Sequence, residues 1–302
     1  MKFALGVNSN EPLHDIVKKS VAAENLGVDY LWISDSPNQL YAPIVADAVA
    51  AETSKIRIGL GLMSTLLHTP NEISRALTTL SDNHGNRFDL CIGVGDRREL
   101  SRVGIHTTNI RKLPLKVLEA KRRIASCLNR EGVRAKIWLG AQGPKMLRVA
   151  NGFDGVLLNY SKVEMIAWAI KMGELRRSHR LTIGTYSPSY VHSKCDRRLL
   201  QKAKISSTVV ALGTANPILR HFGLYEEVSE ARKIVDLNPS LGAAVENIPD
   251  DIVDSFCIFM KVTKLRQYLT MLKRLSVSHV VFSYPQNYSL TTIRELTRAL
   301  NY

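Results

Sequence analysis

Short apolar runs alternate with amphipathic, helix-type patterns along most of the chain, and this alternation is typical of an α/β protein. Buried parallel strands are indicated by the runs Lys2–Val7, Tyr30–Ser34, Ile56–Gly61, Phe88–Gly93, Ile137–Gly140, Gly155–Leu158, Leu181–Ser187 and His279–Ser283. Parallel strands need crossover helices, and a closed barrel leaves no strand edge unpaired. We therefore predict a (β/α)8 barrel, the TIM barrel, with an open doubly wound sheet as the alternative.

The helix after the third apolar run has the clearest start and stop signals. Thr69 and Glu72 have the spacing of a capping box, and Pro70 stands at the first helical position. Gly85 follows the last apolar residue of the stripe and is a typical stop signal. These residues predict a helix that begins at Pro70 and ends before Gly85.

The regular alternation is interrupted between Val191 and Phe259. Four helical patterns lie in this segment: Leu199–Leu212, Ile218–Phe222, Tyr225–Val235 and Asp250–Phe259. We predict a helical insertion between the seventh and eighth strands of the barrel. Because no linker, low-complexity tract or short-period repeat divides the chain, residues 1–302 are expected to form a single barrel domain.

Composition limits the class of protein further. At 302 residues and 45% hydrophobic content the chain can bury one large core. No window reaches the roughly 18 apolar residues of a membrane span, so we expect a cytoplasmic protein without membrane contact. The cysteines are far apart and the histidines form no i,i+3 or i,i+4 pair, which predicts reduced thiols and no metal site.

The chain is strongly basic, with a formal net charge of +14. A positive field attracts nucleic acids, membrane surfaces and polyanionic small molecules. The basic clusters, however, lie on predicted amphipathic helices, and no aromatic-rich basic strand accompanies them. We interpret them as solvated helix faces and do not expect a nucleic-acid partner.

The segment Ile137–Leu147 combines a short apolar run, a glycine-rich corner and the start of a helix. Gly140 and Gly143 leave the corner open to a ligand, and Pro144 suits a first helical turn. The free N–H groups and the dipole of a helix N-terminus favour a phosphate. This corner is a candidate phosphate site; an ordinary strand-to-helix loop is the alternative.

The active site of a (β/α)8 barrel lies at the C-terminal ends of its strands. The expected strand exits are Gly6-Val7, Asp35-Ser36, Gly61 to Ser64, Gly95-Asp96, Gly140 to Pro144, Asn159 to Ser161, Tyr186-Ser187 and Ser283-Tyr284. They contain amides, hydroxyls, glycines and two carboxylates, but no histidine or cysteine. Such a set suits a cofactor that brings its own chemistry, and it gives no support to a Ser/His or Cys/His nucleophile.

The two carboxylates at the exits are open to different interpretations. Asp35 is either a site residue or a turn and N-cap residue. Asp96 follows Gly95, where small residues let a ligand approach, so we favour a functional role for it. His68 precedes the capped helix and is interpreted as a loop residue.

Several segments match a known family in the same order along the whole chain. They are Met1-Lys2-Phe3 with Asn10-Glu11-Pro12, Trp32-Ile33-Ser34-Asp35, Gly59-Leu60-Gly61-Leu62, Ile92-Gly93-Val94-Gly95-Asp96, Gly140 to Pro144 with Met146-Leu147, Asn159-x-Ser161 and Arg220-His221-x-Gly223. The chain resembles the methylene-tetrahydromethanopterin reductases of methanogenic archaea, within the bacterial-luciferase-like barrel superfamily.

This resemblance implies a (β/α)8 barrel that binds the deazaflavin coenzyme F-420, a carrier of hydride. It implies reduction of the methylene bridge of a tetrahydromethanopterin-type C1 carrier in one-carbon metabolism, and a homo-oligomer. It also implies a non-prolyl cis peptide at Gly61-Leu62 behind the ring, a phosphate at Gly140 to Pro144, and Asp96 as the acidic catalytic residue. The expected coenzyme contacts are Asp35, Gly61, Leu62, Met63, Gly95, Gly140, Ala141, Gln142, Gly143, Pro144 and Asn159.

The chain departs from the family at two positions. The family usually has Glu in the first strand, where this chain has Gly6, and Asp-His after the second strand, where it has Asp35-Ser36. Opening the imidazolidine ring of the pterin needs a proton donor, and a buried Glu is a natural one. We therefore expect slow reduction of methylene-pterin. The alternative is a paralogue that binds coenzyme or pterin with another substrate or without turnover.

Overall fold

Eight parallel strands close into a barrel in the computed structural model, which describes residues 1–106, 110–237 and 249–301. The barrel strands are β1 (Lys2–Val7), β2 (Tyr30–Ile33), β3 (Arg57–Ser64), β4 (Phe88–Gly93), β5 (Ile137–Ala141), β6 (Gly155–Leu158), β7 (Thr182–His192) and β9 (Val277–Ser283). Consecutive strands pair in parallel, and β9 pairs with both β7 and β1, which closes the sheet. The predicted (β/α)8 barrel is confirmed, and the open-sheet alternative is wrong.

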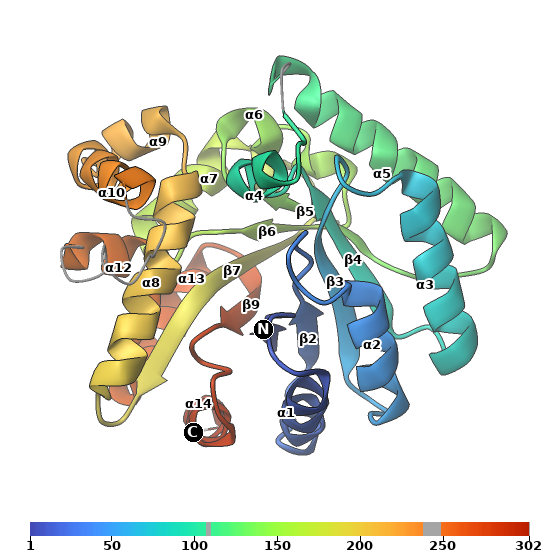
Figure 1. Cartoon of the computed structure of the whole chain (residues 1–302), viewed down its shortest axis with the longest axis horizontal. Coiled ribbons are helices and arrows are strands. Elements are labelled where there is room, and N and C mark those ends of the chain that lie inside the picture. Colours follow the sequence, from blue (N-terminus) through green and yellow to red (C-terminus); the bar gives the residue numbers. More distant parts are fainter. Residues whose placement is uncertain (107–109, 238–248, 302) are drawn as a thin grey trace.

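Helices surround the barrel and cover the outer face of its sheet (Figure 1). They are α1 (Leu13–Asn25), α2 (Ala42–Ala51), α3 (Pro70–His84), α5 (Leu113–Arg130), α6 (Pro144–Leu147), α7 (Val163–Met172), α13 (Val262–Arg274) and α14 (Leu290–Asn301), with the short α4 (Arg97–Arg102) before α5. Neighbours contact one another from α1 through α7, and α14 packs against both α13 and α1. In the part of the chain that the structure describes, no helix is long and apolar enough to cross a membrane.

The start and end of α3 agree with the sequence signals. The amide of Thr69 donates to Glu72 Oε2 at 2.7 Å, and the amide of Glu72 donates to Thr69 Oγ1 at 3.2 Å. Gly85 ends the helix with a φ of 77°, a conformation that glycine adopts without steric cost. The apolar stripe packs into the core through Ile73, Leu77 and Leu80.

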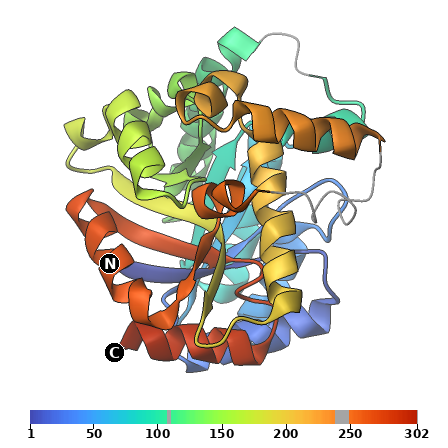
Figure 2. The ribbon, with the colours of Figure 1, turned by 90° about the vertical axis from the view of Figure 1, so that its left-hand side faces the viewer.

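The insertion between the last two barrel strands is mostly helical, as predicted. It contains α8 (Arg197–Gly213), α9 (Asn216–His221), α10 (Tyr225–Leu237), α12 (Asp250–Phe256) and the short strand β8 (Ile258–Lys261). Figure 2 shows α8 beside β7, with α9 and α10 across its C-terminal end. The predicted insertion also includes residues 238–248, which lie outside the described residues.

The predicted helix Asp250–Phe259 is wrong at its end. The helix stops at Phe256, Cys257 is extended, and the residues from Ile258 form β8. Strand β7 continues past the barrel to His192, so the predicted boundary Val191 lies inside a strand. The extension offers a free strand edge with which β8 pairs, and this tertiary pairing decides a conformation that local propensity does not.

Candidate functional site

The interior of the barrel is a packed column of side chains. We call the end of the barrel at the C-terminal ends of the strands the mouth. The buried column consists of Ala4, Tyr30, Trp32, Cys91, Trp138, Leu157 and Val281. Leu62 from β3 and Tyr186 from β7 pack on this column and remain partly exposed. Leu62 stands near the C-terminal end of β3, and Tyr186 follows Thr185, which pairs with the last residue of β6. Both residues therefore lie toward the end of the barrel at which active sites are built. We call Leu62 and Tyr186 the floor.

The exit of β3 shapes one half of the floor. The Gly61–Leu62 peptide bond is cis, as the resemblance implied, and the register with β4 shifts between Leu60 and Met63. The Leu62 side chain fills space that glycines leave open on two neighbouring strands. An ideal Cβ on Gly140 would lie 2.2 Å from Leu62 Cδ1, and one on Gly93 would lie 2.7 Å from it. The missing side chain at Gly140 therefore makes room for the side chain of Leu62. It does not by itself leave space for a phosphate.

The other half of the floor is Tyr186, which lies over Gly6. An ideal Cβ on Gly6 would lie 2.4 Å from Tyr186 Cε2, 2.8 Å from its hydroxyl oxygen and 2.7 Å from Ser283 Cβ. The space that a side chain at position 6 would fill is thus occupied by the tyrosine. Burial, with a smaller contribution from Cys91, raises the pKa of Tyr186 above its usual value. The sequence placed this tyrosine at a strand exit but gave no reason to select it.

Asp35 pairs with a histidine that the sequence analysis interpreted only as a loop residue. His68 Nε2 lies 2.7 Å from Asp35 Oδ2, and the two side chains are 14% and 3% exposed. The other carboxylate oxygen of Asp35 accepts a hydrogen bond of 3.4 Å from the amide of Ala42, the first residue of α2. Asp35 therefore accepts a hydrogen bond from the first residue of α2, and it also pairs with His68 in a largely buried place at the mouth.

The surroundings of Tyr41 extend this polar corner. Its ring centroid lies 5.7 Å from that of His68. Burial raises the pKa of the Tyr41 hydroxyl, and the nearby Asp35 carboxylate raises it further. A histidine beside Asp35 thus comes from the connection after the neighbouring strand β3, while the residue that follows Asp35 in the chain is a serine.

Asp96 lies at the mouth but caps a helix there. Its Oδ1 accepts from the amide of Arg98 at 2.8 Å, and the residue is exposed. Gly95 before it has a φ of 87°, and an ideal Cβ on it would lie 3.0 Å from Ser64 Cβ. An ideal Cβ on Gly213, the last residue of α8, would lie 3.9 Å from Asp96 Oδ2, so the insertion reaches this edge of the mouth. Asp96 is exposed to solvent and therefore lacks the burial that is typical of a carboxylic acid that donates a proton.

The candidate phosphate corner joins β5 to α6. Ala141 is the last residue of β5, Gly143 is the N-cap of α6, and Pro144 is its first residue. An ideal Cβ on Gly143 would meet no atom within 4 Å, which leaves this corner open. Among the described residues, neither the amide of Gly143 nor that of Lys145 has a hydrogen-bond acceptor.

Gln142 ties this corner to two other parts of the mouth. Its Nε2 lies 3.3 Å from the backbone oxygen of Asn159, after β6, and 3.3 Å from Thr214 Oγ1, after α8. Its backbone oxygen accepts from the Tyr160 hydroxyl at 3.1 Å. The structure thus brings together the predicted residues Gln142 and Asn159, and the insertion forms part of the same wall.

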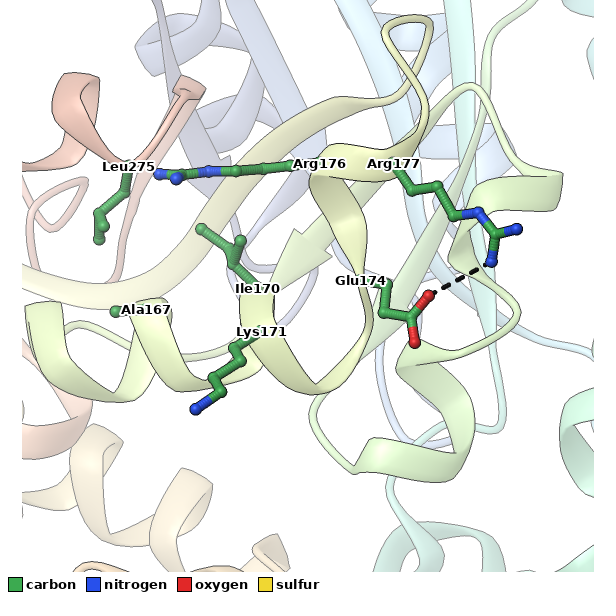
Figure 3. A pocket seen from close by; sticks show the side chains of 7 residues that line it. All are labelled: Ala167, Ile170, Lys171, Glu174, Arg176, Arg177 and Leu275. Atoms are coloured by element: carbon green, nitrogen blue, oxygen red, sulfur yellow. Dashed lines mark hydrogen bonds and ion pairs between the residues drawn. The ribbon is translucent and has the colours of Figure 1, made fainter.

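A surface groove of about 410 Å3 lies away from these residues. Figure 3 shows its lining, which consists of Ala167, Ile170, Lys171, Glu174, Arg176, Arg177 and Leu275. The groove follows the C-terminal end of α7 and precedes β7, so it lies at the N-terminal ends of the strands, opposite the mouth. None of the predicted site residues lines it. Within residues 1–106, 110–237 and 249–301, no group of three His, Cys, Asp or Glu residues could hold a metal ion.

Known proteins have the same barrel fold, and their sequences are similar to this chain at low identity. The family model described as luciferase-like monooxygenase matches residues 2–111. The 5,10-methylenetetrahydromethanopterin reductase of Archaeoglobus fulgidus is 25% identical over 94% of this chain and 94% of its own. The chain resembles the methylenetetrahydromethanopterin reductases. The solved coenzyme F-420-dependent tetrahydromethanopterin reductase of Methanopyrus kandleri has a TM-score of 0.86 and 20% identity, over 99% of this chain and 97% of its own.

A further relative shows how far this likeness extends. The F-420-dependent glucose-6-phosphate dehydrogenase of Kineococcus radiotolerans is 30% identical, over 45% of this chain and 46% of its own. The relatives named here are oxidoreductases that differ in substrate. The similarity therefore indicates a class of enzyme more sharply than it indicates what the enzyme reduces.

Proposed function

We propose that this chain is an F-420-dependent oxidoreductase that transfers hydride between the reduced deazaflavin and methylene-tetrahydromethanopterin or a related C1-carrying pterin. The observation that carries the proposal is the similarity to a methylenetetrahydromethanopterin reductase over 94% of both chains. The mouth adds support, because its wall is built from glycines, amides and hydroxyls. Such a site binds and orients a group that brings its own redox chemistry.

The floor fits a flat ring system. Leu62 presents an aliphatic side chain at the top of the column, and the neighbouring positions Gly93 and Gly140 add no side chain that would rise above it. The coenzyme, when bound, supplies a hydride. The chain's own part would be to hold the ring against Leu62, with Gly61 and Gly95 nearby. Met63 is fully buried in the core and would offer the ring no surface. Packing of the ring against this floor would exclude water from the reacting face.

We place a phosphate of the coenzyme at the Gly140 to Pro144 corner. The free amides of Gly143 and Lys145 can donate to its oxygens, and the exposed ammonium group of Lys145 adds a positive charge. Ala141, Gln142 and Asn159 form the wall that keeps the corner open toward the mouth. The high net charge of +14 favours the approach of an anionic coenzyme from solution.

We place the substrate on the side of the mouth that carries Asp96, and we keep Asp35 among the contacts of the coenzyme. Exposed Asp96 can accept from the amino groups of a pterin. A homo-oligomer built from single barrel domains remains part of this proposal.

The decisive experiment is oxidation of reduced F-420 by the purified protein in the presence of methylene-tetrahydromethanopterin, followed by the absorbance of the coenzyme. We expect oxidation that depends on the pterin, with a reaction lacking pterin as the control. Coenzyme binding without pterin-dependent oxidation would contradict the proposed substrate. It would favour the alternative, a paralogue with another substrate or without turnover, which the absence of a carboxylate at Gly6 already makes worth testing.

A further inference from the structure

The hydroxyl groups at the upper end of the barrel differ in whether their protons are already engaged. Ser187 Oγ donates to the backbone oxygen of Tyr160 at 2.8 Å, and Ser283 Oγ donates to the backbone oxygen of Ser187 at 2.9 Å. Ser64 Oγ donates to the backbone oxygen of Val94. The Tyr186 hydroxyl has no acceptor among the residues that the structure describes. Its proton is therefore available to a ligand on the floor.

The other acidic groups near the floor are less suitable as proton donors. Asp96 is exposed and caps α4, and Asp35 is paired with His68. Cys91 is buried inside the column below the floor and has no surface there that a ligand could reach. Tyr186 is the one of these groups that is both partly exposed to the mouth and free of a partner in the described structure.

The ring and the hydroxyl of Tyr186 occupy the space in which a side chain at position 6 would begin. Its hydroxyl oxygen lies 2.8 Å from where the Cβ of a side chain on Gly6 would be. A side chain from β7 therefore reaches the space that a side chain from β1 would otherwise fill. The Asn287 Nδ2 group donates to the backbone oxygen of Gly6 at 2.8 Å and holds β1 in this place.

We propose that Tyr186 is a catalytic residue, and that its hydroxyl donates the proton that opens the imidazolidine ring of the methylene-pterin. This inference rests on the proposed function. The bond between the bridging carbon and one ring nitrogen breaks, its electron pair stays on that nitrogen, and the nitrogen takes the proton of Tyr186. The carbon, left as an iminium, accepts the hydride that the reduced coenzyme supplies. The phenolate then takes a proton from solvent.

The pH dependence of this donor differs from that of a carboxylic acid. A phenol normally ionises near pH 10, and burial raises the pKa of Tyr186 further. It therefore carries its proton through the whole neutral range. A carboxylic acid in the same role loses its proton as the pH rises through its pKa, and the rate falls with it.

The test uses the full chain and its Tyr186→Phe variant, which keeps the ring over Gly6 and removes only the oxygen. We expect kcat for pterin-dependent oxidation of reduced F-420 to fall about 100-fold or more, the usual contribution of general acid catalysis, with KM and coenzyme affinity nearly unchanged. The matched control is Tyr288→Phe, at a tyrosine that is 39% exposed after β9. It should leave kcat as in the natural chain.

Two further measurements separate the possible outcomes. The kcat of the natural chain should not fall between neutral pH and about pH 9. Its tyrosinate absorbance, minus that of Tyr186→Phe, should show this residue protonated over the same range. A kcat of Tyr186→Phe close to that of the natural chain, or a Tyr186 that is ionised at neutral pH, would overturn the role of Tyr186 but not the proposed function. Coenzyme binding without any pterin-dependent turnover in the natural chain would overturn the proposed substrate and this role together.

Discussion

The imidazole of His68 lies 2.7 Å from the carboxylate of Asp35, although the two residues belong to different strand-to-helix connections. Asp35 follows β2, and His68 follows β3 shortly before α3 begins. Both side chains are largely withdrawn from solvent. The barrel brings them together because β2 and β3 are neighbours and their C-terminal ends open on the same side.

Removal of His68 should destabilise the protein, because the carboxylate of Asp35 would keep only the long hydrogen bond from Ala42. We expect His68→Ala to lower the free energy of unfolding by about 1–3 kcal/mol, as for other buried groups left without a partner. Urea unfolding measures this. His14→Ala is the control, since the His14 side chain is 81% exposed. Equal losses in the two variants would contradict a structural role for the pair.

Gly143 offers a direct test of the phosphate corner. Gly143→Phe should weaken coenzyme binding, because a large side chain would cover the amides of the corner. The melting temperature should stay close to that of the natural chain, since an ideal Cβ there meets no atom within 4 Å and the backbone is extended. Fluorescence titration with F-420 gives the affinity. Asn129→Phe, at an exposed position of α5, is the control. An affinity equal to that of the control would remove the corner from the binding site.

Gly6 should not tolerate a side chain while Tyr186 is present. Gly6→Ala would overlap with the tyrosine ring and with Ser283 Cβ, so we expect a loss of about 1–3 kcal/mol in unfolding free energy. Gly143→Ala, made where space is open, should cost far less. In combination with Tyr186→Ala, the cost of Gly6→Ala should shrink, because one of the two overlaps is gone. Strictly additive losses would show that the two positions do not compete for space.

The free energy of unfolding should depend on pH because of His279. This residue is 2% exposed, and its Nε2 accepts a hydrogen bond of 2.9 Å from Trp32 Nε1. Burial lowers the pKa of His279 to about 4. An unfolded histidine titrates near 6.5, so the unfolded chain binds the extra proton between these two values. The stability due to neutral His279 is complete above about pH 6.5 and falls by about 3 kcal/mol as the pH approaches 4.

Urea unfolding at a series of pH values, for the natural chain and His279→Gln, tests this dependence. A glutamine can accept the Trp32 hydrogen bond but does not titrate. The difference in unfolding free energy between the two proteins should therefore shift in favour of the glutamine variant as the pH falls from about 6.5 to 4. A difference that stays constant with pH would show that His279 does not carry the effect.

Much of the fold could be predicted because it depends on local patterns. The apolar runs matched the barrel strands, and the capping box of Thr69 and Glu72 marked the start of α3. The end of the insertion could not be predicted in the same way. Ile258 to Lys261 carries no local signal that separates a strand from a helix continuation, and its pairing with the end of β7 decides the matter.

The candidate site, like the fold, could be predicted only where it depends on local sequence patterns. The sequence alone determined the strand exits, the open corner at Gly143 and the cis bond implied by the resemblance at Gly61-Leu62. Only the tertiary structure decided that Tyr186 fills the space over Gly6 and that His68 supplies a partner to Asp35. These contacts join residues far apart along the chain, and they depend on strand order and register. Local sequence specifies a strand or a helix, whereas closure of the barrel specifies which side chains share its mouth.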